Sequence, residues 1–192
     1  FGPRFVLFDG PIRVPRLPAP PYHFMSRVTH TEPGDPFAGA VAEAEYDVPA
    51  DAWYFTENGR PVMPVSVLTE VLLQPCGWLS VYVGCPMQSK ENVFFRNLDG
   101  AGKMTGEVFP GCTVRTDTRV TSVSAVSGMM LISYKIECYV GDREVCNLTA
   151  AFGYFSNAAL DMQPGLPTTK EMRAALVEES PVSFDLSERP EK

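Results

Sequence analysis

The stretch that decides the fold is residues 51–79, DAWYFTENGRPVMPVSVLTEVLLQPCGWL. It predicts an aromatic strand at Trp53–Phe55, then a polar turn, then an apolar helix after Pro64. We expect the helix to end at Gly84, because glycine is typical of the position after the last helical residue. Pro75 lies inside this helix and predicts a kink, since an interior proline costs about 3 kcal/mol and one backbone hydrogen bond.

Two polar side chains stand out in this apolar helix. Glu70 and Gln74 are four residues apart, so their side chains share a helix face and can touch. A carboxyl and a carboxamide are costly to bury unless both have partners. We therefore expect the functional site on this helix. The other members of the predicted stripe are Val67, Val71, Trp78 and Val81.

Composition excludes several classes of function. The 192-residue chain has a net charge of −7 and no cluster of Lys and Arg, which excludes nucleic acid and anionic membranes as expected partners. No apolar run reaches the roughly 20 residues that a transmembrane helix requires. Five cysteines without CxxC spacing predict reduced thiols, no metal site and a cytoplasmic location.

The ends of the chain differ from its middle. Residues 1–20 are proline-rich and predict an extended N-terminal arm, with a short strand at Phe5–Phe8. Residues 21–160 form the predicted domain, and 161–192 predict a linker or tail with a surface helix at Lys170–Glu179. Because the chain starts with Phe rather than Met, we expect it to be part of a longer polypeptide.

The rest of the chain predicts an antiparallel sheet. Gly39–Val48 alternates acidic residues with small apolar ones, which is typical of a half-buried strand. Turn pairs divide the second half at Asp99-Gly100, Pro110-Gly111, Ser127-Gly128 and Gly141-Asp142. The strands predicted between them are Val93–Asn97, Met104–Phe109, Thr113–Ala125, Met129–Val140 and Val145–Phe155. One long helix followed by such a meander is an α+β layout.

Several motifs in the sequence also resemble those of a known family. The motifs are Trp53-Tyr54-Phe55, Pro61-Val62-Met63-Pro64, the pair Glu70 and Gln74, Gly106-Glu107-Val108 with Pro110, and Phe152-Gly153-Tyr154-Phe155. They resemble the bacterial β-hydroxydecanoyl thioester dehydratases, which have the hotdog fold of a central helix wrapped by about five to seven antiparallel strands. Leu73–Leu79 and Phe94–Gly100 resemble one branch, the dehydratase-like domains of polyunsaturated fatty acid synthases and polyketide-type megasynthases.

The resemblance implies a reaction and a set of site residues. In that family a His takes the α-proton of a 3-hydroxyacyl thioester, and a carboxylic acid from the helix of the facing protomer protonates the leaving hydroxyl. The substrate is carried on the phosphopantetheine of an acyl carrier protein, and no other cofactor is implied. Glu70 matches the acid, which we expect to be buried with a raised pKa, and Gln74 matches the amide that orients it. The implied substrate contacts are Val65, Met63, Asn58 and Trp78.

The sequence departs from the family at two points. The turn Thr56–Arg60, where the family carries its His, has none. Val65 stands where the family usually has the Gly that lets backbone approach the thioester carbonyl. The chain has two histidines, His23 and His30, and we expect the first to pack among aromatic side chains and the second to lie in a surface loop.

Three functions follow from this departure. In the first, the chain donates Glu70 and Gln74 to a composite site whose His comes from a neighbouring hotdog domain. In the second, it is a non-catalytic pseudo-dehydratase that supports dimerisation. In the third, it is a hotdog thioesterase that uses Glu70 to activate water. We also expect pairing with a second hotdog, either another copy or a neighbouring domain, because hotdog helices leave apolar surface and sheet edges that a second copy normally covers.

Overall fold

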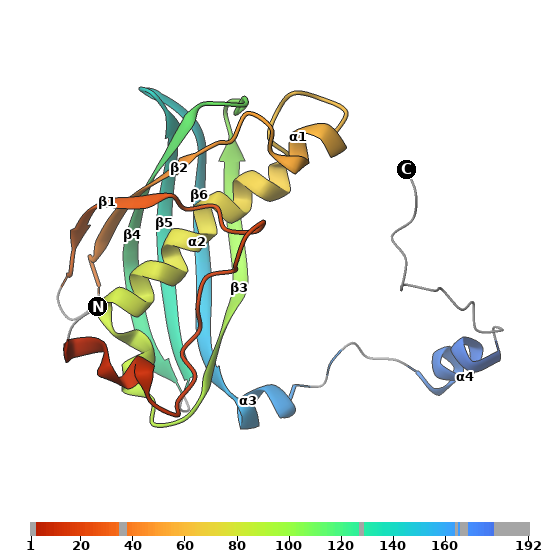
Figure 1. Cartoon of the computed structure of the whole chain (residues 1–192). Helices are drawn as coiled ribbons and strands as arrows, with labels where there is room; N and C mark the ends of the chain where they lie inside the picture. The colour runs from red at the N-terminus through yellow and green to blue at the C-terminus, as the bar shows by residue number, and fades with distance from the viewer. Residues whose placement is uncertain (1–2, 35–37, 127–128, 164, 166–168, 179–192) are drawn as a thin grey trace. The chain divides into compact units, whose positions relative to one another are not determined.

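The computed structural model describes residues 3–34, 38–126, 129–163, 165 and 169–178. Within these residues, a six-stranded antiparallel sheet wraps around one long helix, α2 (Val65–Val83), which confirms the hotdog fold (Figure 1). The strands pair in the order β1-β2-β4-β5-β6-β3. Their bounds are β1 Arg27–Glu32, β2 Val41–Asp47, β3 Val93–Met104, β4 Thr113–Val126, β5 Met129–Val140 and β6 Arg143–Ser156.

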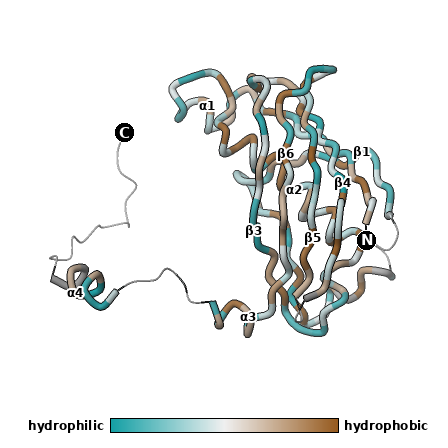
Figure 2. Tube along the Cα trace, turned by 180° about the vertical axis from the view of Figure 1, so that it is seen from behind, coloured by the Kyte–Doolittle hydropathy of each residue, from teal (hydrophilic) through white to brown (hydrophobic). Residues whose placement is uncertain are grey.

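The core lies between α2 and the concave face of the sheet. The helix buries Leu68, Leu72 and Leu79, which together form one side of the hydrophobic cluster. On β2 the predicted alternation is confirmed, because Ala42 and Ala44 are buried between exposed or half-buried acids. Figure 2 views the sheet from its other side and shows hydrophobic and hydrophilic residues interspersed along the strands, as expected when only one face is covered.

The helix ends where the sequence predicts. Gly84 adopts a φ of 96°, and its N–H donates to the carbonyls of Ser80 and Val81, which closes the last turn. Pro64 is the N-cap residue and provides no side-chain hydrogen bond to the first turn. The helix continues through Pro75 as one element, so the kink expected there stays a prediction.

Two predicted strands near the N-terminus are wrong. Trp53–Phe55 begins a short helix, α1 (Trp53–Glu57), because the consecutive residues Tyr54 and Phe55 are both buried, whereas a strand would point them to opposite faces. Phe5–Phe8 lies in a 3₁₀ helix, η1 (Pro3–Asp9). Residues three apart eclipse in a 3₁₀ helix, and the rings of Phe5 and Phe8 accordingly have centroids 5.4 Å apart.

The prediction for residues 93–109 is also wrong. Val93–Met104 is one continuous strand, and Met104–Phe109 does not form the separate strand that was expected. Asp99 and Gly100 pair with Ala151 and Ala150 of β6, directly after a bulge at Leu98, and do not form a turn. The length of β6 explains why β3 is one strand. Strand β6 pairs with β3 from Val93 to Met104, so the chain does not turn within this range.

The remaining sheet predictions agree with the structure. Gly141-Asp142 forms the turn between β5 and β6, and Ser127-Gly128 lies outside the described residues. Other short elements are η2 (Cys85–Gln88) and α3 (Asn157–Asp161).

Residue contacts divide the chain into two units, Phe1–Leu160 and Asp161–Lys192. The second contains α4 (Lys170–Glu178), where a surface helix was expected, whereas the expected unpacked segment at 181–192 lies outside the described residues. No helix in the described ranges has both the length and the apolar character needed to cross a membrane.

Candidate functional site

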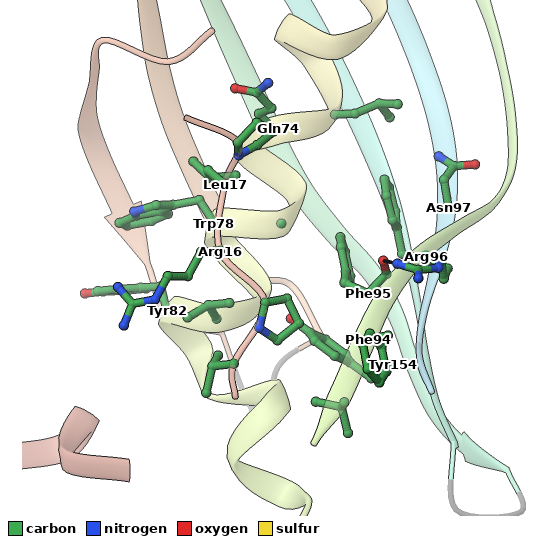
Figure 3. Close-up of a pocket in the computed structure, with 18 of the residues that line it drawn as sticks. Arg16, Leu17, Gln74, Trp78, Tyr82, Phe94, Phe95, Arg96, Asn97 and Tyr154 are labelled. Atoms are coloured by element: carbon green, nitrogen blue, oxygen red, sulfur yellow. Dashed lines mark hydrogen bonds between the residues drawn. The ribbon is translucent and has the colours of Figure 1, made fainter. Parts of the chain in front are cut away.

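A pocket of about 870 Å³ opens between α2 and the edge strand β3 (Figure 3). The arm forms its third wall, since residues 13–18 run alongside α2 (Figures 1 and 3). Strand β6 contributes Phe152 and Tyr154 to the floor. A pocket of this size, lined mainly by apolar and aromatic side chains with a few polar groups, is typical of a small-molecule site.

The α2 residues that line the pocket change character along the helix. The two polar residues lie before the single glycine, and the two aromatic residues lie after it. Over this span the helix rises about 18 Å. The α2 wall of the pocket therefore carries Glu70 and Gln74 toward one end and aromatic rings toward the other, while Arg13 and Arg16 of the arm add charge to the lining. In order, the lining residues are Glu70, Leu73, Gln74, Gly77, Trp78, Val81 and Tyr82.

Stacked rings line two walls of the pocket. On α2, the rings of Trp78 and Tyr82 have centroids 4.9 Å apart and planes 12° apart. Phe5 of the arm stacks on Tyr82 at 6.5 Å. On the opposite wall, Phe95 and Phe152 stack at 4.5 Å with planes 2° apart. Trp78 lines the pocket, and its role as a substrate contact stays a prediction.

Gln74 has a different set of partners from the one expected. Its side chain is 4% exposed. Its Oε1 accepts a hydrogen bond from Phe24 N–H at 2.8 Å, and its Nε2 donates to the Tyr22 carbonyl at 2.7 Å. The amide is therefore satisfied by the backbone on both sides of His23, and its expected hydrogen bond to Glu70 is not among the described contacts.

Glu70 is exposed, which corrects the expectation of a buried acid. It lies on the side of α2 that lines the pocket, not on the side that packs against the sheet. Within the described part of the chain its side chain has no hydrogen bond or ion pair. Its carboxyl group is thus available to a ligand or to a facing protein surface.

The two histidines also differ from expectation. His23 is exposed and lines the pocket, rather than packing in the core. Its Nδ1 lies 3.1 Å from the carbonyl of Pro18. His30 is exposed as expected, but it lies on β1 instead of in a loop, with its Nε2 3.2 Å from Glu32 Oε1.

Three of the predicted substrate contacts lie away from this pocket. Met63 is buried in the core cluster. Asn58 donates from Nδ2 to the Val62 carbonyl at 3.1 Å, which is turn chemistry. Val65 is 60% exposed at the first turn of α2. The structure therefore brings Glu70 and Gln74 together with Trp78 but leaves these three elsewhere.

The residues at the floor of the pocket, Phe152 and Tyr154, were not among the predicted site residues. Tyr154 is buried there, and its hydroxyl lies 2.7 Å from Ser80 Oγ, which in turn donates to the Gly77 carbonyl. Burial raises the pKa of Tyr154 well above its usual value, although the hydrogen bond with Ser80 opposes the shift. Sequence could have indicated only that Phe152-Gly153-Tyr154-Phe155 forms a strand, since its neighbours come from distant segments.

The described residues offer no metal or thiol chemistry. Among them, no group of three or more His, Cys, Asp or Glu side chains could hold a metal ion. All five cysteines are free, and burial raises the pKa of the Cys76 and Cys85 thiols. A raised pKa opposes thiolate formation, so these cysteines fit the expected role of small buried side chains.

Comparison with known proteins gives three results. Residues 17–149 match the FabA-like domain family. One of the chains of the polyunsaturated fatty acid synthase of Thraustochytrium sp. (strain ATCC 26185 / S-3) is 33% identical over 141 residues, which span 70% of this chain and 9% of that protein. The dehydratase heterocomplex ApeI:P from Xenorhabdus doucetiae shares the fold, with a TM-score of 0.58 at 10% identity over 74% of this chain and 90% of that chain.

Proposed function

Because the chain belongs to the FabA-like domain family, we propose that it dehydrates 3-hydroxyacyl thioesters as one half of a composite site. The partner half is a second hotdog domain, either another copy or a neighbouring domain, and the substrate is carried by an acyl carrier protein. We also propose that the domain spans residues 21–160, between the arm and a C-terminal linker at 161–192.

One observation carries this proposal. Glu70 is an exposed carboxyl group without a described partner, and it lines the pocket together with Gln74 and His23. An exposed acid at that position can reach a group on a facing domain. The turn Thr56–Arg60 has no His, so the imidazole that the chemistry requires has to come from outside this turn. Both facts fit a site completed by a partner.

The geometry of α2 supports two separate half-sites. Val65, at the start of the helix, and Glu70 are five residues apart, which places them about 140° apart around the helix axis. Of these two residues, Glu70 lines the pocket and Val65 does not. One site therefore does not use both the first turn of α2 and Glu70 from the same chain. In two facing hotdog domains, each site could combine the first turn of α2 from one domain with the acid from the other. The heterocomplex structure with the same fold is consistent with such pairing.

The chemistry assigned to Glu70 is general-acid catalysis. The reaction breaks the Cα–H and Cβ–O bonds of the substrate and forms the Cα=Cβ double bond. The partner's imidazole takes the α-proton, and Glu70 gives its proton to the β-hydroxyl, which leaves as water. A second domain that covered the pocket would keep water away, and this generally favours the neutral form of a carboxyl group. Gln74 then contributes by holding the segment that carries His23.

Hydration of an enoyl thioester by the polypeptide that contains this chain and its neighbouring hotdog tests the proposal. We expect Glu70→Gln to lower turnover by about 10²- to 10⁴-fold, the usual contribution of a general acid. Asp51→Asn is the control, because Asp51 is also exposed but lies outside the pocket. Unchanged turnover in Glu70→Gln would remove the catalytic role of this residue.

Two further outcomes separate the alternatives. Full activity of this chain alone, without a second hotdog, would contradict the composite site. Release of free thiol from a saturated acyl thioester, abolished by Glu70→Gln, would identify a thioesterase instead.

A further inference from the structure

We propose that His23 binds the pantetheine arm of the substrate, with its Nε2 accepting a hydrogen bond from the amide N–H next to the thioester sulfur. This role rests on the proposed acyl thioester substrate and adds a binding residue to the same site. Three features support it: the place of His23 on the pocket wall, the hydrogen bond that fixes its tautomer, and its offset from Glu70 along α2.

The contact with Pro18 decides which nitrogen of the His23 ring carries the proton. Nδ1 lies 3.1 Å from the Pro18 carbonyl, and because a carbonyl oxygen has no hydrogen to donate, Nδ1 has to be the donor. In the neutral ring Nε2 is then the acceptor. Within the described part of the chain, Nε2 has no hydrogen-bond partner. His23 therefore offers the pocket a lone pair.

The backbone around His23 is held in place on both sides. Gln74 accepts from the Phe24 N–H at 2.8 Å and donates to the Tyr22 carbonyl at 2.7 Å. The Tyr22 N–H in turn donates to the Ala19 carbonyl at 3.1 Å, which closes a turn. Because this segment is already ordered, a ligand that bonds to the His23 ring pays little of the entropy that ordering a loop would cost.

His23 and Glu70 lie on the same side of the point where the pocket walls come together. That point is Gly77, where an added Cβ atom would lie 3.5 Å from Phe95 and 3.7 Å from Leu17. Glu70 precedes Gly77 on α2, and so does the amide that holds the His23 segment. A ligand that contacts Glu70 can therefore reach His23 without passing between these walls.

The offset along α2 is similar to the distance between two groups of the substrate. Glu70 and Gln74 are four residues apart, which is a rise of about 6 Å. In an acyl-pantetheine thioester, the β-carbon and the amide nitrogen next to the sulfur are six bonds apart, about 7–8 Å when extended. With the β-hydroxyl at Glu70 and the arm following α2, the amide N–H reaches the level of His23. An N–H donor is the group that the lone pair on Nε2 can bind.

An analogue in which an ester oxygen replaces this amide N–H tests the hydrogen bond without turnover. The protein is the polypeptide that contains this chain and its neighbouring hotdog. The ligands are saturated acyl-pantetheine thioesters, which have no hydroxyl group to eliminate. By calorimetry, wild type should bind the amide about 3- to 10-fold more tightly than the ester, the usual contribution of one hydrogen bond. Equal binding of the two ligands would overturn the role of His23 without any substitution.

Substitutions of His23 should change this preference. His23→Leu has no acceptor, so we expect it to bind the amide and the ester equally. His23→Gln should retain part of the preference, because a side-chain amide oxygen can replace Nε2 as the acceptor. His30→Leu should retain all of it and is the matched control, since His30 is the chain's other histidine and lies on β1, outside this pocket. A preference that persisted in His23→Leu would assign the N–H to another acceptor and contradict the proposal.

Turnover separates this role from the proposed function. In hydration of an enoyl-pantetheine thioester, His23→Leu should raise KM rather than lower kcat, because a hydrogen bond to a non-reacting part of the substrate is equally strong in the ground state and the transition state. A fall in kcat of about 10²-fold or more would make His23 the base and overturn its binding role. If no thioester binds to wild type, the proposed substrate class fails. If thioesters bind without preference for the amide, the His23 contact fails alone.

Discussion

Gln74 and Glu70 are one helical turn apart, yet their environments are opposite. Gln74 is buried, and both of its polar atoms are bonded to the backbone of residues 22 and 24. Glu70 is exposed at the pocket. At the scale of single residues, the amide therefore fastens the segment around His23 to α2, while the carboxyl group is the one available for chemistry.

Gln74→Ala should lower the free energy of unfolding by about 1–3 kcal/mol, because it leaves the buried Phe24 N–H without an acceptor. The measurement is the urea midpoint and slope of the isolated chain. Gln88→Ala is the control, since Gln88 is exposed and its loss should change stability by less than about 0.5 kcal/mol. Equal effects of the two substitutions would show that the backbone hydrogen bonds of Gln74 contribute nothing to stability.

At the scale of elements, α2 contains or adjoins two glycines that are present for different reasons. Gly77 has ordinary helical backbone and lines the pocket, where Phe95 and Leu17 approach α2. Gly84 adopts a left-handed conformation that ends the helix. At the first position a Cβ atom would make ordinary van der Waals contacts with Phe95 and Leu17, whereas at the second position backbone sterics oppose any side chain.

Alanine at these two positions should have opposite effects on stability. Gly77→Ala should raise the free energy of unfolding by about 0.5–1 kcal/mol, because alanine loses less conformational entropy in a helix. Gly84→Ala should lower it by about 1–2 kcal/mol, since its φ of 96° is strained for a residue with a Cβ. Thermal and urea unfolding of both variants measure the difference. A loss of stability in Gly77→Ala would show that Phe95 and Leu17 pack too closely on α2 to accept one more methyl group.

At the scale of the whole molecule, the sheet has a long edge strand that no other described strand covers. Strand β3 pairs with β6 on one side only, and it is exposed along most of its twelve residues. Leu98, on this strand, is 49% exposed. Long edge strands with apolar side chains favour pairing with another sheet, which fits the proposed second hotdog.

The isolated chain should therefore self-associate at micromolar concentration in sedimentation velocity experiments. Leu98→Lys should weaken the association, because a charged residue on an edge strand opposes pairing. Val6→Lys, a substitution at an exposed position away from β3, should leave it unchanged. A monomer at these concentrations would exclude self-pairing and leave a neighbouring hotdog domain as the only proposed partner.

Local patterns were sufficient for most of the fold. The period of β2, the bounds of α2 and the turn at Gly141-Asp142 follow from residues that lie next to one another in the chain. Local patterns gave wrong predictions where the structure of a segment depends on a partner that is distant in the sequence. The long strand β6 extends β3 through Asp99-Gly100, and core burial converts the aromatic run at Trp53 into a helix.

The sequence by itself determined the family, the fold and the helix that carries Glu70, because each depends on residue types at fixed spacing. Only the tertiary structure decided how these residues are used. It buried Gln74 against backbone from the N-terminal segment, left Glu70 exposed, and placed Phe5 and Phe8 among the residues that line the pocket. Burial and pocket shape arise from contacts between segments far apart in the chain, which no local spacing encodes.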